Sequence, residues 1–144
     1  MAKSGQKYPL ANCLVLVGAL LSSQAANAFS CDAGPYVIFF DQNSASIGDE
    51  AREILAYAKD AAQVCKYSKV RIEGHSDTAE TVEMSDKRVD RVRDLFRELG
   101  FAEEMTHAVS YGPNRLRKST GPDVPMRENR RVEITFGPWE VPAD

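Results

Sequence analysis

The chain has 144 residues, 27% of them charged, and a formal net charge of −3 at pH 7. This length is typical of a single domain with one hydrophobic core. The acidic balance argues against nucleic acid and against an anionic membrane surface as partners, because both attract basic patches.

The first 28 residues have the features of a secretory signal peptide. Lys3 and Lys7 give a positive start, an apolar run covers residues 13–21, and Ala26-Asn27-Ala28 supplies the small residues of a cleavage site. The apolar run is shorter than the roughly 20 residues that a transmembrane helix needs. We therefore expect residues 1–28 to be removed and no integral membrane span to remain. An uncleaved anchor is the alternative.

Two cysteines, Cys31 and Cys65, remain after the loss of Cys13. An even number of cysteines in an exported chain predicts a disulfide, which would tie the N-terminal tail to the end of the first helix. The alternative is two separate thiols, with Cys65 packed on an apolar helix face. A lipid anchor on Cys31 is disfavoured, because the residues before it lack the leucine-plus-small-residue pattern of a bacterial lipobox.

From residue 36 the hydrophobic pattern predicts strands and helices in turn. The apolar run Tyr36–Phe40 predicts a buried strand, and a helix follows from about Asp49. That helix has small and apolar residues at helical spacing on one face. They are Ala51, Ile54, Leu55, Ala58, Ala61, Ala62 and Cys65. Residues 69–73 alternate between apolar and polar and predict a second strand, which Gly74 ends.

A second helix is expected from about Ser85, a good N-cap residue, to Leu99. A weaker strand follows at 106–112, then a long loop at 113–128 with three prolines, then a last strand at 130–136. The order β-α-β-α-β-β predicts an α+β two-layer sandwich, with two main helices on one face of a mixed four-stranded sheet. We expect residues 29–35 to be an N-terminal tail, 36–137 the domain, and 138–144 a flexible C-terminal tail.

Two charged residues flank the loop between the second strand and the second helix. Asp77 lies just past the end of the strand, where α/β units place ligands. Arg88 lies in the first turn of the helix, on its apolar side. Together they suit an α-amino acid group, with Asp77 taking the ammonium and Arg88 taking the carboxylate by a two-pronged bond. A plain Asp–Arg ion pair is the alternative, and spacing does not separate the two.

Arg130 is the third candidate for a ligand-binding residue. It shares strand parity with Val132 and Ile134 and so faces the helix layer, whereas Arg131 faces outward. The alternative is a strand-end arginine paired with a loop carboxylate.

Several short motifs, in this order, resemble those of the OmpA-like C-terminal domain, the peptidoglycan-binding module also found in Pal and MotB proteins. The matching segments are Ile38–Ser44 with Ile47, Ile72-Glu-Gly-His-Ser-Asp77, Met84-Ser85-x-x-Arg88 with Val92, Tyr111-Gly112 and Asn129–Ile134. Each motif is weak alone, but the ordered set spans roughly residues 36–136, and the strand and helix order agrees with it.

The resemblance implies noncovalent binding of peptidoglycan through the diaminopimelate of its stem peptide. The family's roles fall on Asp77 for the amine and on Arg88 for the carboxylate, with Arg130 nearby. It also implies the periplasm of a Gram-negative bacterium, in association with the outer membrane or the cell wall. An outer-membrane or envelope protein is a further candidate partner.

The loop Thr78–Glu83 departs from the family pattern. It is shorter and lacks the glycine and the ligand-contacting asparagine of the family. It also carries Glu80 and Glu83, which we expect to repel a ligand carboxylate. This leaves a second function open, that of an OmpA-like fold that has lost wall binding and serves as a periplasmic protein-interaction or structural module.

The sequence does not favour an enzyme. His75, Ser76 and Asp77 are consecutive, and neighbouring side chains of an extended chain point to opposite sides, so they cannot line up as a relay. The histidines, cysteines and carboxylates have no metal-ligand spacing. We therefore expect no catalysis, no cofactor and no metal.

Overall fold

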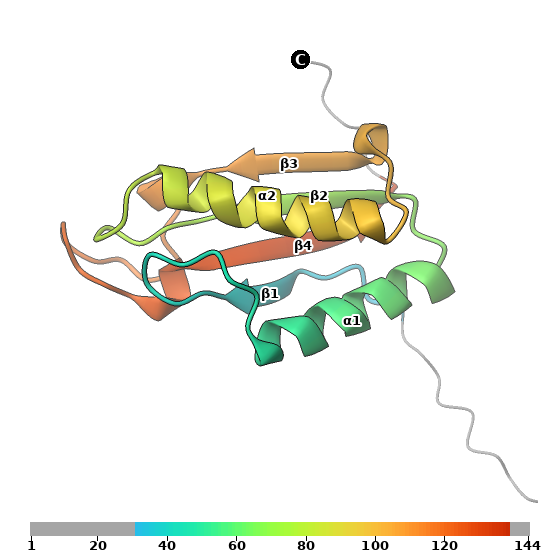
Figure 1. The fold of residues 1–144 in the computed structure, drawn as a ribbon, viewed down its shortest axis with the longest axis horizontal. Coiled ribbons are helices and arrows are strands. Elements are labelled where there is room, and N and C mark those ends of the chain that lie inside the picture. The colour runs from blue at the N-terminus through green and yellow to red at the C-terminus, as the bar shows by residue number, and fades with distance from the viewer. Residues whose placement is uncertain (1–30, 139–144) are drawn as a thin grey trace, which may run out of the picture.

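The computed structural model describes residues 31–138, which form one sheet covered on one face by two helices (Figure 1). The strands are β1 Tyr36–Phe39, β2 Lys69–Gly74, β3 Thr106–Ser110 and β4 Arg131–Gly137, and the helices are α1 Asp49–Val64 and α2 Glu83–Glu98. Three short 3-10 helices are η1 Glu103–Met105, η2 Gly112–Asn114 and η3 Arg127–Asn129. The expected signal peptide and nearly all of the expected C-terminal tail lie outside the described residues.

The sheet has the strand order β1-β4-β2-β3. Strands β2 and β3 are parallel, while β4 runs antiparallel to both β1 and β2. Ile72 of β2 lies opposite Ile134 of β4, and Ile38 of β1 lies opposite Val132. The two-layer α+β architecture and the mixed sheet confirm the fold predicted from the sequence. None of the helices within residues 31–138 has the length and apolar character needed to cross a bilayer.

The core lies between the helices and the facing side of the sheet. The side chains that form it are Ile38, Phe40, Leu55, Ala58, Ala62, Val70, Ile72, Val89, Val92, Phe96, Val132, Ile134 and Phe136. Phe136 is its aromatic centre, stacked on Tyr67 at 5.7 Å between ring centroids and edge-on to Phe96 at 5.8 Å. The predicted apolar faces of both helices are therefore the buried ones.

The pairing of Cys31 with Cys65 that the sequence favours is present as a disulfide. The Cα atoms of the two residues are 5.6 Å apart, and Cys65 caps the C-terminus of α1. The Tyr67 hydroxyl also donates a hydrogen bond of 3.1 Å to the Cys31 carbonyl. Both contacts fasten the segment before β1 to the end of α1.

Gly74 allows α2 to lie directly against the end of β2. A Cβ atom at this position would overlap Cγ2 of Val89 and come within 2.8 Å of the Ser85 carbonyl oxygen. Only glycine fits such a close approach of backbone to backbone without a shift. The residue thereby brings the N-terminal part of α2, which carries Arg88 in its second turn, beside the loop that follows β2.

The predicted N-cap role of Ser85 is wrong. Helix α2 begins at Glu83, and Val82 in αR conformation occupies the cap position without a side-chain hydrogen bond. The helix extends upstream because the Met84 and Ser85 amides already donate to the Thr81 and Val82 carbonyls. Ser85 is instead buried inside the first turn, where its Oγ donates to Val82 at 2.7 Å and accepts from the Gly112 amide at 3.1 Å.

Candidate functional site

The segments that carry the candidate residues meet at one end of the sheet. The loop after β1, the loop between β2 and α2, the start of α2 and the long loop before β4 all gather at the left of Figure 1. This follows from topology, because the C-terminal ends of β1, β2 and β3 and the start of β4 share that edge.

Asp77 is fully buried and accepts hydrogen bonds on both carboxylate oxygens. Its Oδ1 accepts from the Ala79 amide at 3.0 Å, and its Oδ2 accepts from the Met126 amide at 2.9 Å. Arg130 Nη1 donates to the same Oδ2 at 2.7 Å. Asp77 therefore holds a cation already, and that cation comes from the start of β4. This arrangement is the strand-end arginine paired with a loop carboxylate that the sequence left open.

Arg88 is also fully buried, and its partner is Glu80. Nη1 donates to Oε2 at 2.7 Å and Nη2 donates to Oε1 at 2.6 Å, so the pair is bidentate. The side chains of both residues are 0% exposed. The plain Asp77–Arg88 ion pair considered from the sequence is not the arrangement found, because each residue binds a different partner.

Backbone groups complete the surroundings of Arg88. Its Nε donates to the Ser44 carbonyl at 3.0 Å, Nη2 to the Asp41 carbonyl at 3.1 Å and Nη1 to the His75 carbonyl at 3.2 Å. The same turn supplies the Asn43 amide, which donates to Glu80 Oε1 at 2.7 Å. Asn43 has φ 53°, a left-handed conformation that asparagine tolerates.

Phe40 links the two ion pairs. The Arg88 guanidinium lies 5.2 Å from the centre of its ring. Its carbonyl accepts from Arg130 Nε at 3.1 Å, and its amide donates to the Arg130 carbonyl at 2.9 Å. Asp77–Arg130 and Glu80–Arg88 thus form one buried cluster of two positive and two negative side chains.

Two polar residues that the sequence did not single out as site residues fix the neighbouring loops. Asn129 is fully buried and pairs with the Lys118 backbone through two hydrogen bonds of 2.8 Å. Thr78 Oγ1 donates to the Gly121 carbonyl at 2.7 Å and accepts from the Val124 amide at 3.1 Å. The Asn129 contacts brace the long loop before β4 internally, and the Thr78 contacts hold that loop against the loop after β2.

His75 lies on the other side of the chain from this cluster. Its ring packs against Tyr111 at 5.4 Å between centroids, and it is almost fully buried. Burial first, and then the positive charge of Arg131, lower the pKa of His75 to about 4, against the opposing effect of Glu133. Arg131 faces the side opposite Arg130, as expected, but it is buried and pairs with Glu133 at 2.6 Å.

A cavity of about 280 Å³ adjoins the cluster at the start of α1. Phe39, Phe40, Asp41, Glu50 and Arg127 are among the residues that line it. Arg127 forms an ion pair of 2.8 Å with Glu50, and its guanidinium lies 5.0 Å from the centre of the Phe39 ring. Since Phe40 and Asp41 also contact Arg130 and Arg88, this cavity opens beside the buried charges.

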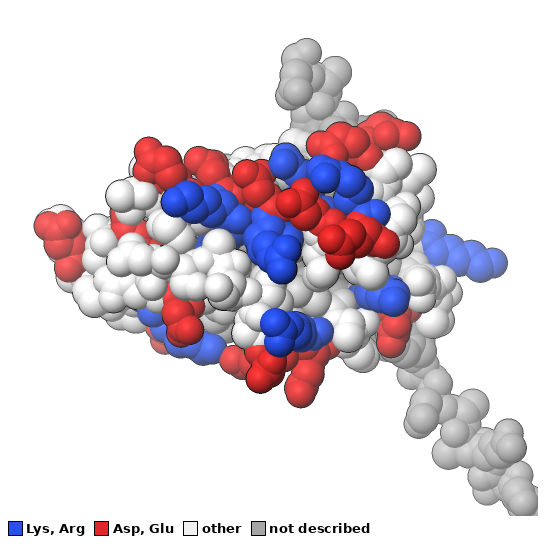
Figure 2. Space-filling view, in the orientation of Figure 1, with Lys and Arg blue, Asp and Glu red and all other residues white. Residues whose placement is uncertain are grey.

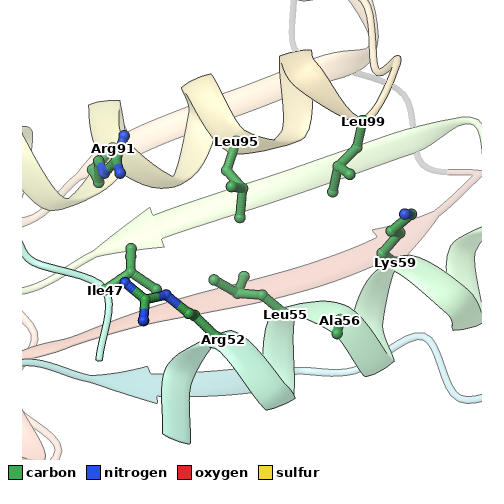
Figure 3. A pocket seen from close by; sticks show the side chains of 8 residues that line it. All are labelled: Ile47, Arg52, Leu55, Ala56, Lys59, Arg91, Leu95 and Leu99. Atoms are coloured by element: carbon green, nitrogen blue, oxygen red, sulfur yellow. The ribbon is translucent and has the colours of Figure 1, made fainter. Parts of the chain in front are cut away.

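A second cavity of about 280 Å³ lies between α1 and α2 (Figure 3). Leu55, Leu95 and Leu99 point toward one another across it, and Arg52, Lys59 and Arg91 also line it. Long cationic side chains commonly cover the apolar edge of a core with their stems. On the same face, acidic and basic side chains alternate along α2 (Figure 2).

The described residues contain no group of three or more His, Cys, Asp or Glu that could hold a metal ion.

The sequence model described as the OmpA family matches residues 39–130, most of the domain that carries this site. The chain belongs to the OmpA family. The match runs from the end of β1 to Arg130 and so includes every residue of the buried cluster. Members of this family are generally structural or binding modules.

Several solved structures have the same fold. The peptidoglycan-associated lipoprotein from Burkholderia pseudomallei is 23% identical with a TM-score of 0.61, covering 71% of this chain and 90% of its own. The OmpA-like domain of FopA1 from Francisella tularensis is 18% identical with a TM-score of 0.59, covering 70% and 72%. A putative MotB-like protein from Desulfovibrio vulgaris is 22% identical with a TM-score of 0.56, covering 69% of each chain. No match was found among curated protein sequences.

Proposed function

We propose that this OmpA-like domain binds cell-wall peptidoglycan noncovalently, in the periplasm of a Gram-negative bacterium, through the diaminopimelate of the stem peptide. Arg88 takes the diaminopimelate carboxylate and Asp77 takes its ammonium. Arg130, the third predicted ligand-binding residue, neutralises Asp77 in the unbound protein. The module carries out no catalysis and needs no cofactor or metal.

The observation that carries this proposal is the set of donors around Arg88. The two Nη groups of the guanidinium and the Asn43 amide converge on one carboxylate. A planar fork with an added backbone N–H suits a carboxylate in both charge and geometry. Asp77 lies in the same buried cluster and supplies the opposite charge. A zwitterionic α-amino acid group needs this pairing of charges at close range.

The family relationship and the fold also support the proposal. Similar structures include that of a peptidoglycan-associated lipoprotein. The cavity beside Phe40 and Asp41 offers room next to the charges for the rest of a stem peptide. The signal peptide expected over residues 1–28 agrees with a periplasmic location, and an outer-membrane or envelope protein remains a candidate partner.

A second function is favoured by one specific observation. Asp77 and Arg88 are both 0% exposed, and each already binds an opposite charge of the same chain. In this second function the cluster has a purely structural role, which is to hold three loops together. The module has then lost wall binding and contacts other envelope proteins instead. The two functions differ in one measurable property, which is whether the protein binds to isolated sacculi and pellets with them.

Co-sedimentation of the purified protein with isolated sacculi tests the proposal. We expect saturable pelleting that a soluble diaminopimelate-containing stem peptide competes away. Arg88→Lys keeps the charge but loses the fork, and Asp77→Asn loses the charge, so both should pellet less. Arg91→Ala, which removes an exposed cation on the same helix, is the matched control and should pellet like the wild type. Wild-type protein that stays in the supernatant at all concentrations contradicts wall binding.

A further inference from the structure

Glu80 occupies the position in which a bound carboxylate would be expected. Its two oxygens receive three short hydrogen bonds, from Arg88 Nη1, Arg88 Nη2 and the Asn43 amide, at 2.6 to 2.7 Å. Its side chain is fully buried, although the residues after it in the loop are exposed. A glutamate without a specific role on a surface loop would have its carboxylate exposed to water.

The loop geometry explains how this carboxylate reaches Arg88. Residues 78–82 form the short connection from β2 to α2, and Glu80 lies eight residues before Arg88. Thr78 anchors one end of the connection to the long loop, and Val82 caps α2 at the other. Glu80 is therefore near the middle of the connection, with its backbone between two fixed ends.

We propose that Glu80 is an internal ligand of this site, whose carboxylate fills the cradle formed by Arg88 and the Asn43 amide in competition with an external carboxylate. This inference rests on the proposed function for the identity of the competitor. A stem peptide can engage Arg88 only when residues 79–82 release Glu80. The exchange replaces one carboxylate by another on the same three donors.

The other pole of the site is Asp77, and it is likewise occupied by a group of the same chain. The Arg130 guanidinium supplies Asp77 with its cation, as a ligand ammonium would. The Ala79 amide binds Asp77 Oδ1, and Ala79 is the neighbour of Glu80 in the chain. When Glu80 moves away from Arg88, Ala79 therefore moves with it, and the hydrogen bond from the Ala79 amide to Asp77 is weakened. The two poles open together, which matches a ligand that carries both charges.

Acetate is the probe for the cradle itself. The substitution Glu80→Ala removes one methylene and the carboxylate, and acetate has the size of that missing piece. We expect the melting temperature of Glu80→Ala to be lower than that of the wild type and to rise saturably with added acetate. Chloride and acetamide at the same concentrations should not reproduce the rise. The matched control is Glu83→Ala, which removes an exposed carboxylate from the first residue of α2, three positions after Glu80.

Each outcome of the acetate titration decides whether the Glu80 carboxylate is an internal ligand of the cradle. An acetate-specific rise in Glu80→Ala, but not in Glu83→Ala or in the wild type, supports an internal carboxylate in the cradle. An equal rise in all three proteins, or none in Glu80→Ala, overturns it. If Glu80→Ala is unfolded without acetate, the same titration is followed as acetate-dependent folding by circular dichroism, with the same two readings.

Competition is tested with Glu80→Gln, which keeps the length of the side chain and loses its charge. We expect this variant to bind a soluble diaminopimelate-containing stem peptide at least about tenfold more tightly than the wild type, because the binding-competent fraction rises. Equal affinity for both proteins overturns the competition. An acetate response together with no peptide binding by either protein leaves the internal carboxylate in place and removes the proposed function instead.

Discussion

Glu80 and Arg88 bind each other through two hydrogen bonds of 2.6 and 2.7 Å, and neither side chain reaches solvent. A buried ion pair of this kind is tolerated only when the remaining donors are satisfied, and the carbonyls of Asp41, Ser44 and His75 do this for Arg88. The pair fixes the loop after β1 against the start of α2. It also places a carboxylate at the position that we propose for the ligand carboxylate.

The Asp77–Arg130 pair should contribute to stability because it is buried. Asp77→Asn leaves Arg130 without its counter-charge, and we expect a loss of about 3 kcal/mol in the free energy of unfolding, measured by urea denaturation. Asp49→Asn, which breaks an exposed pair with Arg52, is the control and should leave the midpoint nearly unchanged. Similar losses in both variants would show that burial does not set the strength of the Asp77 pair.

Gly74→Ala should destabilise the domain through a clash. The added Cβ meets Val89 and the Ser85 carbonyl, so α2 must move away from β2, at a cost of about 1–3 kcal/mol. Thermal unfolding measures the effect. Gly121→Ala is the matched control, since a Cβ there has nothing within 4 Å. A Gly74→Ala protein as stable as the Gly121→Ala protein would contradict the close approach of helix and strand.

The Cys31–Cys65 disulfide should stabilise the domain mainly by restricting the unfolded chain. The two cysteines are 34 residues apart, and a loop of this size predicts about 3–4 kcal/mol in the chain-entropy account. The double variant Cys31→Ser/Cys65→Ser should therefore melt lower than the wild type under oxidising conditions. Addition of a reductant should lower the wild-type melting temperature to that of the variant. A wild-type protein unaffected by reductant would contradict the contribution.

His75 should make stability depend on pH below neutrality. Its pKa is about 4 in the folded protein and near 6.5 in an unfolded chain, so the unfolded state binds more protons between these values. The contribution is fully present above pH 6.5 and decreases as the pH falls toward 4, by about 1–3 kcal/mol in all.

The variant His75→Gln tests this dependence, because it removes the titrating ring. We expect a flatter plot of unfolding free energy against pH between about 4 and 6.5, with the limits set by the two pKa values. His107→Gln, on β3, is the comparison variant for the loss of a histidine elsewhere in the sheet. An unchanged slope in His75→Gln would assign the dependence to other groups.

The fold could be predicted because its strands and helices have clear periodicity. The apolar faces of α1 and α2 and the alternation in β2 and β4 specify two layers, and the order of the elements limits the topology. Within the site, Arg130 was placed on the helix side of the sheet by strand parity alone. Arg88 was placed on the apolar side of α2, which its burial confirms, but it lies in the second turn and not the first, because the helix begins at Glu83.

The partners of these residues could not be predicted from periodicity. Glu80 reaches Arg88 because of the path of residues 78–82, and the sequence indicated only that its charge would repel a ligand. Its actual role depends on Asn43 and on the turn after β1, which lies far away in the chain. The start of α2 was missed for a related reason. Serine is a common N-cap residue, but the Oγ of Ser85 accepts a hydrogen bond from the Gly112 amide of another loop.

The most direct test of the whole account compares wild type, Glu80→Gln and Arg88→Lys for binding to sacculi at one protein concentration below saturation. We expect Glu80→Gln to pellet most, the wild type less and Arg88→Lys least, because Glu80→Gln lacks the internal competitor and Arg88→Lys lacks the guanidinium fork that binds a carboxylate. Pelleting of Arg88→Lys equal to that of Glu80→Gln, or no pelleting of any of the three, would contradict it.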